Sequence, residues 1–262
     1  FMRVIKEFPN FEEVTSAYIA MAEFSIEEGK HDLAIQYLKN LIRDTKSPDY
    51  PYALFKMAWS YFYLNDIPQT MNFAKQYLQF HTNKIEGAKS KSDPSLAHAN
   101  VVMRNEMLAD VPLFYMRGFD LHLPEFPVSN ALNYFRSMAS NYSTNEIFEE
   151  MLLKFTKLLR SHGQEAALVN WKDQVIVGEA KRPVALEVFL LVYEDQLNKY
   201  RYKNVVESTK DMEKLFERSG GSYSFAPAYR FLLDVAGKVQ KTIFEEKNSK
   251  GGQALSLSLI HI

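Results

Sequence analysis

The sequence predicts an all-α protein of paired antiparallel helices, with no β-sheet. Among 262 residues, only 10 are glycine and 10 are proline, and Leu, Ala, Lys, Glu and Phe are abundant, a composition that favours helix. Hydrophobic residues make up 47% of the chain, which is ample for a continuous core and excludes a disordered chain. Apolar residues recur at helical spacing in segments that turn residues separate into pairs.

The clearest helix pair lies within residues 47–81, with its turn at residues 65–68. Apolar residues recur at helical spacing on both helices, namely Leu54, Met57, Ala58 and Tyr61 on the first and Met71, Ala74, Tyr77 and Leu78 on the second. The small Ala58 and Ala74 let the two backbones approach closely. A single pair cannot bury its own apolar faces, so further pairs must stack against it.

This segment resembles one unit of the tetratricopeptide repeat, although Asn65 stands where the family has glycine. Residues 11–45 resemble the same unit through the small residues Ala22 and Ala34, the turn residue Gly29 and the bulky Leu38. The resemblance implies an α-solenoid, in which helix hairpins stack into a right-handed superhelix. The segments YPYALFKMAWSYFYLND and KEFPN also resemble long envelope-associated repeat proteins of Gram-negative bacteria.

The chain is predicted to divide at changes in composition and periodicity. We assign 1–10 to the tail of a preceding repeat, 11–81 to two well-formed units, 82–93 to a polar linker (a loop or a helix extension), 94–218 to three divergent helix pairs, 219–247 to a further helix without its partner, and 248–262 to a soluble tail. Turn positions are expected at Gly29, Asn65, Gly118, Gly163 and about Tyr200.

Both ends are interpreted as cuts in a longer repeat protein. The opening residues read as the last turns of a repeat helix, and residues 257–262, LSLIHI, resemble the translation of a transposon-end adaptor used in sequencing libraries, so we interpret them as an artefact. Truncated ends would expose apolar helix faces, which makes self-association possible.

Charge and composition exclude several classes of function. With 31 basic and 32 acidic residues the net charge is −1, which argues against nucleic acid as the main partner. The absence of cysteine rules out disulfides, thiolate catalysis and cysteine-bound metals. No apolar run approaches the ~20 residues that a membrane span needs. No catalytic, phosphate-binding or dinucleotide motif is present, so we predict no enzyme activity, no cofactor and no metal.

The histidines are predicted to lie singly at the surface: His31, His81, His98 and His162. One alternative remains in the insertion over residues 119–126, where Asp120, His122 and Glu125 could surround a metal. An enzyme or metal protein that uses this insertion is therefore the competing hypothesis from another class.

The resemblance implies that the first helix of each pair lines a concave wall that holds an extended peptide or a short helix. Carried onto this sequence, the wall comprises Tyr52, Phe55, Trp59, Phe62 and Tyr63, with Ile19, Glu23 and Ile26 before them and Lys157 and Arg160 as basic points further on. The alternative is that the rings pack only against the next repeat. We favour binding for Trp59 and Tyr63, whose polar atoms need water or a partner.

The predicted function is a non-enzymatic helical-repeat scaffold that mediates protein–protein interaction, as part of a larger bacterial envelope protein in the periplasm or at the outer membrane. A cytoplasmic adaptor or regulator is the alternative within the same class. Aromatic rows also stack on sugars, so a groove that holds glycan is a third possibility.

Overall fold

In a computed structural model, the described residues are 1–7, 14–90, 93–142, 145–198, 202–226, 230 and 237. They form helices joined by turns, with no strand in any of these ranges. The predicted all-α class is therefore confirmed. The chain divides into two compact units, Phe1–His162 (unit 1) and Gly163–Ile262 (unit 2). None of the described helices is long and apolar enough to cross a bilayer.

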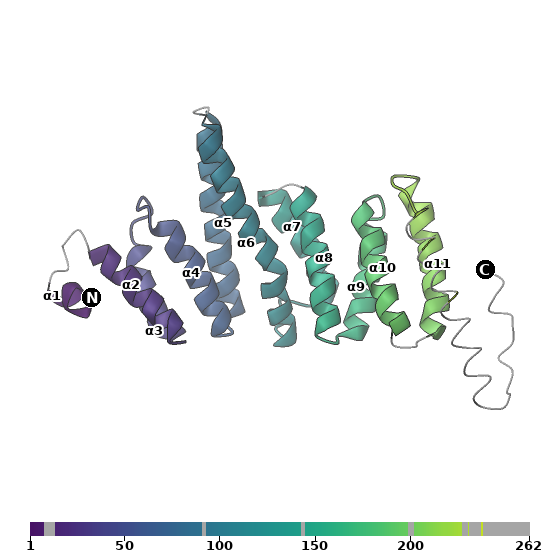
Figure 1. Cartoon of the computed structure of the whole chain (residues 1–262), viewed down its shortest axis with the longest axis horizontal. Coiled ribbons are helices and arrows are strands. Elements are labelled where there is room, and N and C mark those ends of the chain that lie inside the picture. The colour runs from purple at the N-terminus through teal and green to yellow at the C-terminus, as the bar shows by residue number, and fades with distance from the viewer. Residues whose placement is uncertain are drawn as a thin grey trace. The chain divides into compact units, whose positions relative to one another are not determined.

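Unit 1 consists of helices that pack as successive hairpins (Figure 1). Their bounds are α1 Met2–Glu7, α2 Val14–Glu27, α3 His31–Leu41, α4 Tyr50–Tyr63, α5 Ile67–Ser90, α6 Pro94–Asp120, α7 Val128–Tyr142 and α8 Asn145–Ser161. Each helix from α2 to α5 packs on the next one, and α8 packs on both α6 and α7.

The first two hairpins have the turns and the close helix contacts that the sequence predicts. Gly29, with φ of 69°, ends the turn between α2 and α3, and Asn65 takes the equivalent left-handed conformation at 62° between α4 and α5. The small residues at the helix contacts are fully buried: Ala22, Ala34, Ala58 and Ala74. The Arg117 side chain of α6 donates from Nε to Asn65 Oδ1 at 2.7 Å, so a later helix holds this turn residue.

The third hairpin, α5 with α6, is much longer than the first two, and its tip extends beyond the neighbouring helices of unit 1 (Figure 1). Residues 82–90, predicted as a polar linker that forms either a loop or a helix extension, continue α5 as helix. Ile85 is only 3% exposed and Ala88 is also buried, so two apolar residues among lysines suffice to hold the extension against α6. Asp93 caps α6 by accepting a hydrogen bond from Leu96 N at 3.0 Å.

A buried histidine lies within this long hairpin. His81 was predicted at the surface, but it is buried between α5 and α6. Asn100 donates from Nδ2 to the Leu96 carbonyl at 2.8 Å, which leaves Asn100 Oδ1 to accept from His81 Nδ1 at 2.7 Å. His81 Nε2 is buried and has no hydrogen-bond partner among the residues that the structure describes.

Gly118 does not occupy a turn, contrary to the prediction. It lies inside α6, two residues before the last residue of the helix, and its missing side chain leaves room for the ring of Phe126. The left-handed turn residue is His122, with φ of 57°. Leu123 N then donates to the Gly118 carbonyl at 3.0 Å, which folds the loop back on the helix end. The glycine is therefore required for close packing and not for the turn.

Unit 2 contains three described helices: α9 Glu165–Gly178, α10 Pro183–Asn198 and α11 Tyr202–Ser219. They pack on one another around the fully buried Trp171 and Phe189. The boundary between the two units falls within the turn of the fourth predicted helix pair, so the pairing of α8 with α9 stays a prediction. Predictions for Tyr200, for most of the helix over 219–247 and for the tail over 248–262 lie outside the described residues.

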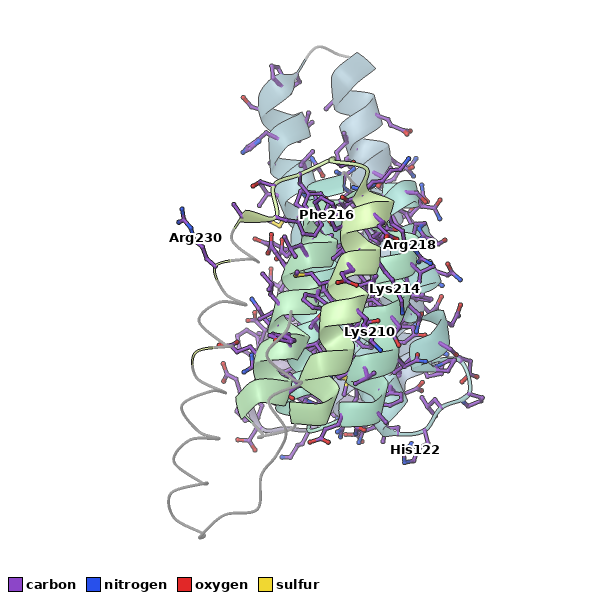
Figure 2. The ribbon with its side chains drawn as sticks, turned by 90° about the vertical axis from the view of Figure 1, so that its right-hand side faces the viewer. His122, Lys210, Lys214, Phe216, Arg218 and Arg230 are labelled. Atoms are coloured by element: carbon purple, nitrogen blue, oxygen red, sulfur yellow. The ribbon has the colours of Figure 1, made fainter. Side chains whose placement is uncertain are left out.

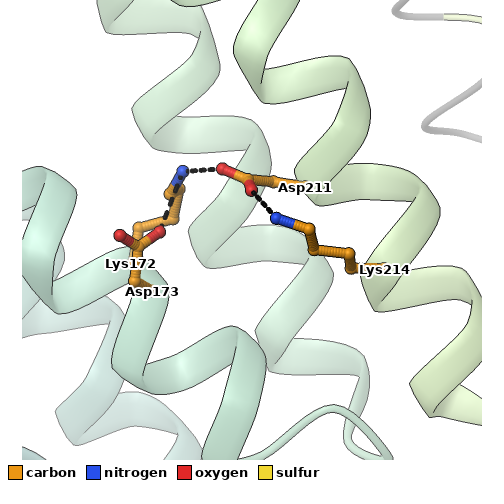
Figure 3. Close-up of polar contacts among 4 residues, drawn as sticks. All are labelled: Lys172, Asp173, Asp211 and Lys214. Atoms are coloured by element: carbon orange, nitrogen blue, oxygen red, sulfur yellow. Dashed lines mark hydrogen bonds and ion pairs between the residues drawn. The ribbon is translucent and has the colours of Figure 1, made fainter.

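A buried lysine joins α9 to α11 (Figure 3). The Lys172 ammonium is almost inaccessible to solvent, donates a hydrogen bond to the Asp211 carboxylate, and forms an ion pair with Asp173 Oδ1 at 3.1 Å. Lys214 approaches the other oxygen of Asp211 at 3.4 Å. A buried charge is tolerated only when it is paired, so this network fixes how α11 lies against α9.

Candidate functional site

One face of α4 carries a continuous row of aromatic rings. Phe55, Trp59, Phe62 and Tyr63 are spaced so that helical periodicity brings them to one side of the helix. The ring of Trp59 lies 6.5 Å from Phe55, 5.5 Å from Phe62 and 6.2 Å from Tyr63 between centroids. The five wall residues predicted on α4 therefore include four whose rings form one cluster.

Part of this cluster packs against α6. Trp59 meets the fully buried Phe114 edge-on at 5.2 Å, and Phe62 lies 5.3 Å from the same ring. Phe55 is directed towards Tyr77 of α5, with centroids 5.7 Å apart. Phe55, Trp59 and Phe62 are each partly buried, so their rings contribute to the packing between helices. Packing of the rings against a neighbouring repeat is the alternative that the sequence left open.

Tyr63 differs from the other rings because it faces solvent. Its side chain belongs to a residue that is 59% exposed, and its ring stacks on His31 at 4.6 Å with an angle of 12° between the planes. We call His31, Trp59 and Tyr63 the Tyr63 ledge. Burial lowers the pKa of His31, which favours the uncharged form of the ring that stacks on Tyr63.

Two of the predicted wall residues bind each other. The Tyr52 hydroxyl donates to Glu23 Oε1 at 2.9 Å and so links α4 to α2. The Lys56 ammonium lies 5.4 Å from the centre of the Tyr52 ring. Burial, followed by the hydrogen bond to Glu23, raises the pKa of Tyr52. The polar atoms of this pair are therefore already used within the protein.

The remaining predicted wall residues lie on helices to either side of α4. Ile19 and Ile26 are partly buried on α2. Lys157 is exposed and Arg160 is partly buried on α8. Neighbouring Lys154 donates to Asp110 Oδ1 of α6 at 3.0 Å, which shows that basic residues of α8 also serve packing between helices.

The insertion over 119–126 does not gather its three ligand-type residues. Asp120 pairs with His162, the residue that follows α8, with 2.8 Å between Oδ2 and Nδ1, while His122 is exposed at the loop (Figure 2). Phe126 anchors the loop by packing edge-on against Tyr115 at 5.2 Å. Across the described ranges, no group of three acidic or histidine side chains is placed to hold a metal ion.

The sequence did not reveal the two residues that decide which rings stay exposed. Phe114 was expected in the core from its helical spacing, but nothing in the pattern indicated that it would cover Trp59 and Phe62. His31 was treated as an isolated surface histidine, whereas it supports Tyr63. The only local signal for His31 is its place as the first residue of α3, next to the turn.

Comparison with known families supports the predicted resemblance for one segment. Residues 52–83 match the tetratricopeptide repeat family, a stretch that includes all five predicted wall residues of α4 and most of α5. Repeats of this family generally mediate protein–protein interactions. No curated protein matches the chain.

Proposed function

We propose that this chain, which carries a tetratricopeptide repeat at residues 52–83, is a non-enzymatic scaffold that binds a protein segment across α3 and α4. The function of this repeat family supports binding of a protein or peptide. The Tyr63 ledge is the contact surface that we assign to that segment. Phe55 and Phe62 serve to support the ledge from within.

The observation that carries this proposal is the exposure of an ordered aromatic ring. Tyr63 is 59% exposed, yet stacking on His31 and proximity to Trp59 restrict its ring. A ring that is already ordered loses little entropy on binding, and tyrosine and tryptophan are the residues most often found at binding hot spots. Tyr63 therefore combines a large accessible surface with a low cost of ordering.

A display library of random peptides, selected on the purified chain, tests the proposal. We expect selected peptides to bind the Tyr63→Ala variant at least about tenfold more weakly in calorimetry, since removing a hot-spot ring costs more than ~1.4 kcal/mol. Phe216→Ala is the matched control because Phe216 is an exposed ring in unit 2. Equal affinity for Tyr63→Ala, with helicity unchanged by circular dichroism, would refute the assignment.

We further propose that the scaffold works in the bacterial envelope, in the periplasm or at the outer membrane. The support is the resemblance of residues 6–10 and 50–66 to envelope-associated repeat proteins. Fractionation of cells that express the full-length protein tests this location. Recovery in the cytosol would favour the alternative of a cytoplasmic adaptor.

A further inference from the structure

Unit 2 contains a cleft that is separate from the Tyr63 ledge. It lies where the turn between α9 and α10 meets the last turn of α11, and its volume is about 480 Å³. Its lining includes Val177, Glu179, Lys181, Arg182 and Arg218. The volume falls within the range of about 300–1,000 Å³ that is typical of ligand sites.

The cleft carries excess positive charge. Arg182 Nε donates to Glu179 Oε2 at 2.9 Å, so the one acidic residue among those named is neutralised from within. Lys181 and Arg218 are exposed and have no acidic partner in the part of unit 2 that the structure describes. The carboxyl-terminal ends of α9 and α11 carry partial negative charges from the helix dipoles, which together amount to about one negative charge. One of the two cations offsets this charge. A net positive charge remains.

Basic residues continue from the cleft along α11. Lys210, Lys214 and Arg218 recur at intervals of four residues and lie along one side of the helix (Figure 2). Lys214 shares Asp211 with the buried Lys172, so Asp211 cannot neutralise both lysines.

The rim of the cleft is fixed before any ligand binds. Arg182 N donates to the Glu179 carbonyl at 2.8 Å, which closes the turn. The Tyr223 hydroxyl donates to the Ala180 carbonyl at 3.0 Å and ties the segment after α11 to the same turn. Val177, which is 63% exposed, adds an apolar surface to the lining. A rigid rim reduces the entropy that a ligand must lose on binding.

We propose that this cleft binds an acidic peptide segment in which a carboxylate lies beside an apolar side chain. Arg218 and Lys181 hold the carboxylate through charge-assisted hydrogen bonds, and the apolar side chain packs on Val177. Lys210 and Lys214 attract further acidic residues of the segment.

A peptide fits this surface better than a nucleic acid does. Glu213 and Glu217 are exposed on the same helix as the basic residues, and they would repel a continuous phosphate backbone. The chain as a whole has a net charge of −1, whereas nucleic-acid binding relies on a basic excess. Discrete carboxylates can be placed between these glutamates, which is possible for a peptide of mixed sequence.

The probe for this proposal is the fluorescein-labelled peptide Glu-Leu-Glu-Glu-Leu-Glu, measured by fluorescence anisotropy on the full chain. We expect binding that weakens as salt is added and that falls about tenfold or more in the double variant Lys181→Gln/Arg218→Gln, since two charge-assisted contacts are lost. Lys39→Gln is the matched control, because Lys39 is an exposed lysine in unit 1, and it should leave the affinity unchanged.

Four results would overturn the proposal: no binding of the acidic peptide, equal binding of the version with glutamine in place of glutamate, unchanged affinity in the double variant, or tighter binding of a single-stranded oligonucleotide at the same residues. Circular dichroism shows whether the double variant is folded, and both of its changes are at the surface. The Tyr63→Ala variant should bind the acidic peptide as the parent does, so the two proposals can fail separately.

Discussion

Replacing Gly118 with alanine tests the close approach between α6 and the loop that follows it. A Cβ at this position would lie 2.5 Å from Cδ2 and 3.0 Å from Cβ of Phe126, closer than packed carbons allow. Phe126 has little space to move, because it is 5% exposed and packs against Tyr115. Overpacking of this kind costs about 1–3 kcal/mol, and the better helix propensity of alanine returns about 1 kcal/mol. We expect a net loss of up to about 2 kcal/mol.

Gly87→Ala is the matched control, since Gly87 lies in α5 with no atom within 4 Å of the added Cβ. Here only the helix propensity changes, so we expect a gain of about 0.5–1 kcal/mol. Urea unfolding followed by tryptophan fluorescence measures both values. The chain has two tryptophans, and a shared Trp171→Phe background leaves Trp59 as the reporter for unit 1.

A double variant tests whether contact with Phe126 causes the loss of stability in Gly118→Ala. Phe126→Ala removes Cγ and Cδ2, the two ring atoms nearest the new Cβ, so the double variant should lose less stability than the two single changes add up to. If Gly118→Ala instead gains stability as Gly87→Ala does, the glycine has no packing role and the reasoning is wrong.

Three further predictions concern charge and aromatic packing. Burial lowers the pKa of His81 below its ordinary value, so the unfolded chain takes up a proton at a higher pH than the folded chain does. The urea midpoint should therefore fall as pH drops below about 6.5. His81→Asn should reduce the dependence of the midpoint on pH, and an unchanged dependence would contradict the prediction. Asp211→Asn should destabilise unit 2 by about 3 kcal/mol in thermal or urea unfolding, because Lys172 loses its main partner. Lys172→Met should cost less, because no buried charge remains. Equal losses of stability in the two variants would argue against the pairing of Lys172 with Asp211. Trp59→Ala should lower the free energy of unfolding by about 2–3 kcal/mol through lost packing on the neighbouring helix. Tyr63→Ala should change it by no more than about 0.5 kcal/mol. Similar losses for both variants would place Tyr63 in the core.

The helix pairs could be predicted because their signals are local. The spacing of Leu54, Met57 and Tyr61 specifies one face of α4, and the left-handed turns at Gly29 and Asn65 follow from residue types that accept positive φ. The sequence left residues 82–90 open between a loop and a helix extension, because lysines obscured the burial of Ile85. Whether such a segment is helix or loop depends on the helix that packs against it, here α6, and the residues of the segment itself do not specify that helix.

Gly118 illustrates why a correct residue type can receive a wrong role. A glycine that ends a helix and a glycine that admits a neighbouring ring are identical in the sequence, and only the position of Phe126 separates them. The same limit applies to the candidate site. Helical spacing brought Trp59, Phe62 and Tyr63 to one face of α4, but it could not state which rings Phe114 covers.

The sequence by itself determined the helical class, the first two hairpins and the aromatic face of α4, because each depends on residues within a few positions of one another. The tertiary structure decided that Tyr63 is the exposed ring, that His81 is buried and that Lys172 joins α9 to α11. Exposure and charge pairing depend on residues that are distant in the chain and become neighbours only when helices pack.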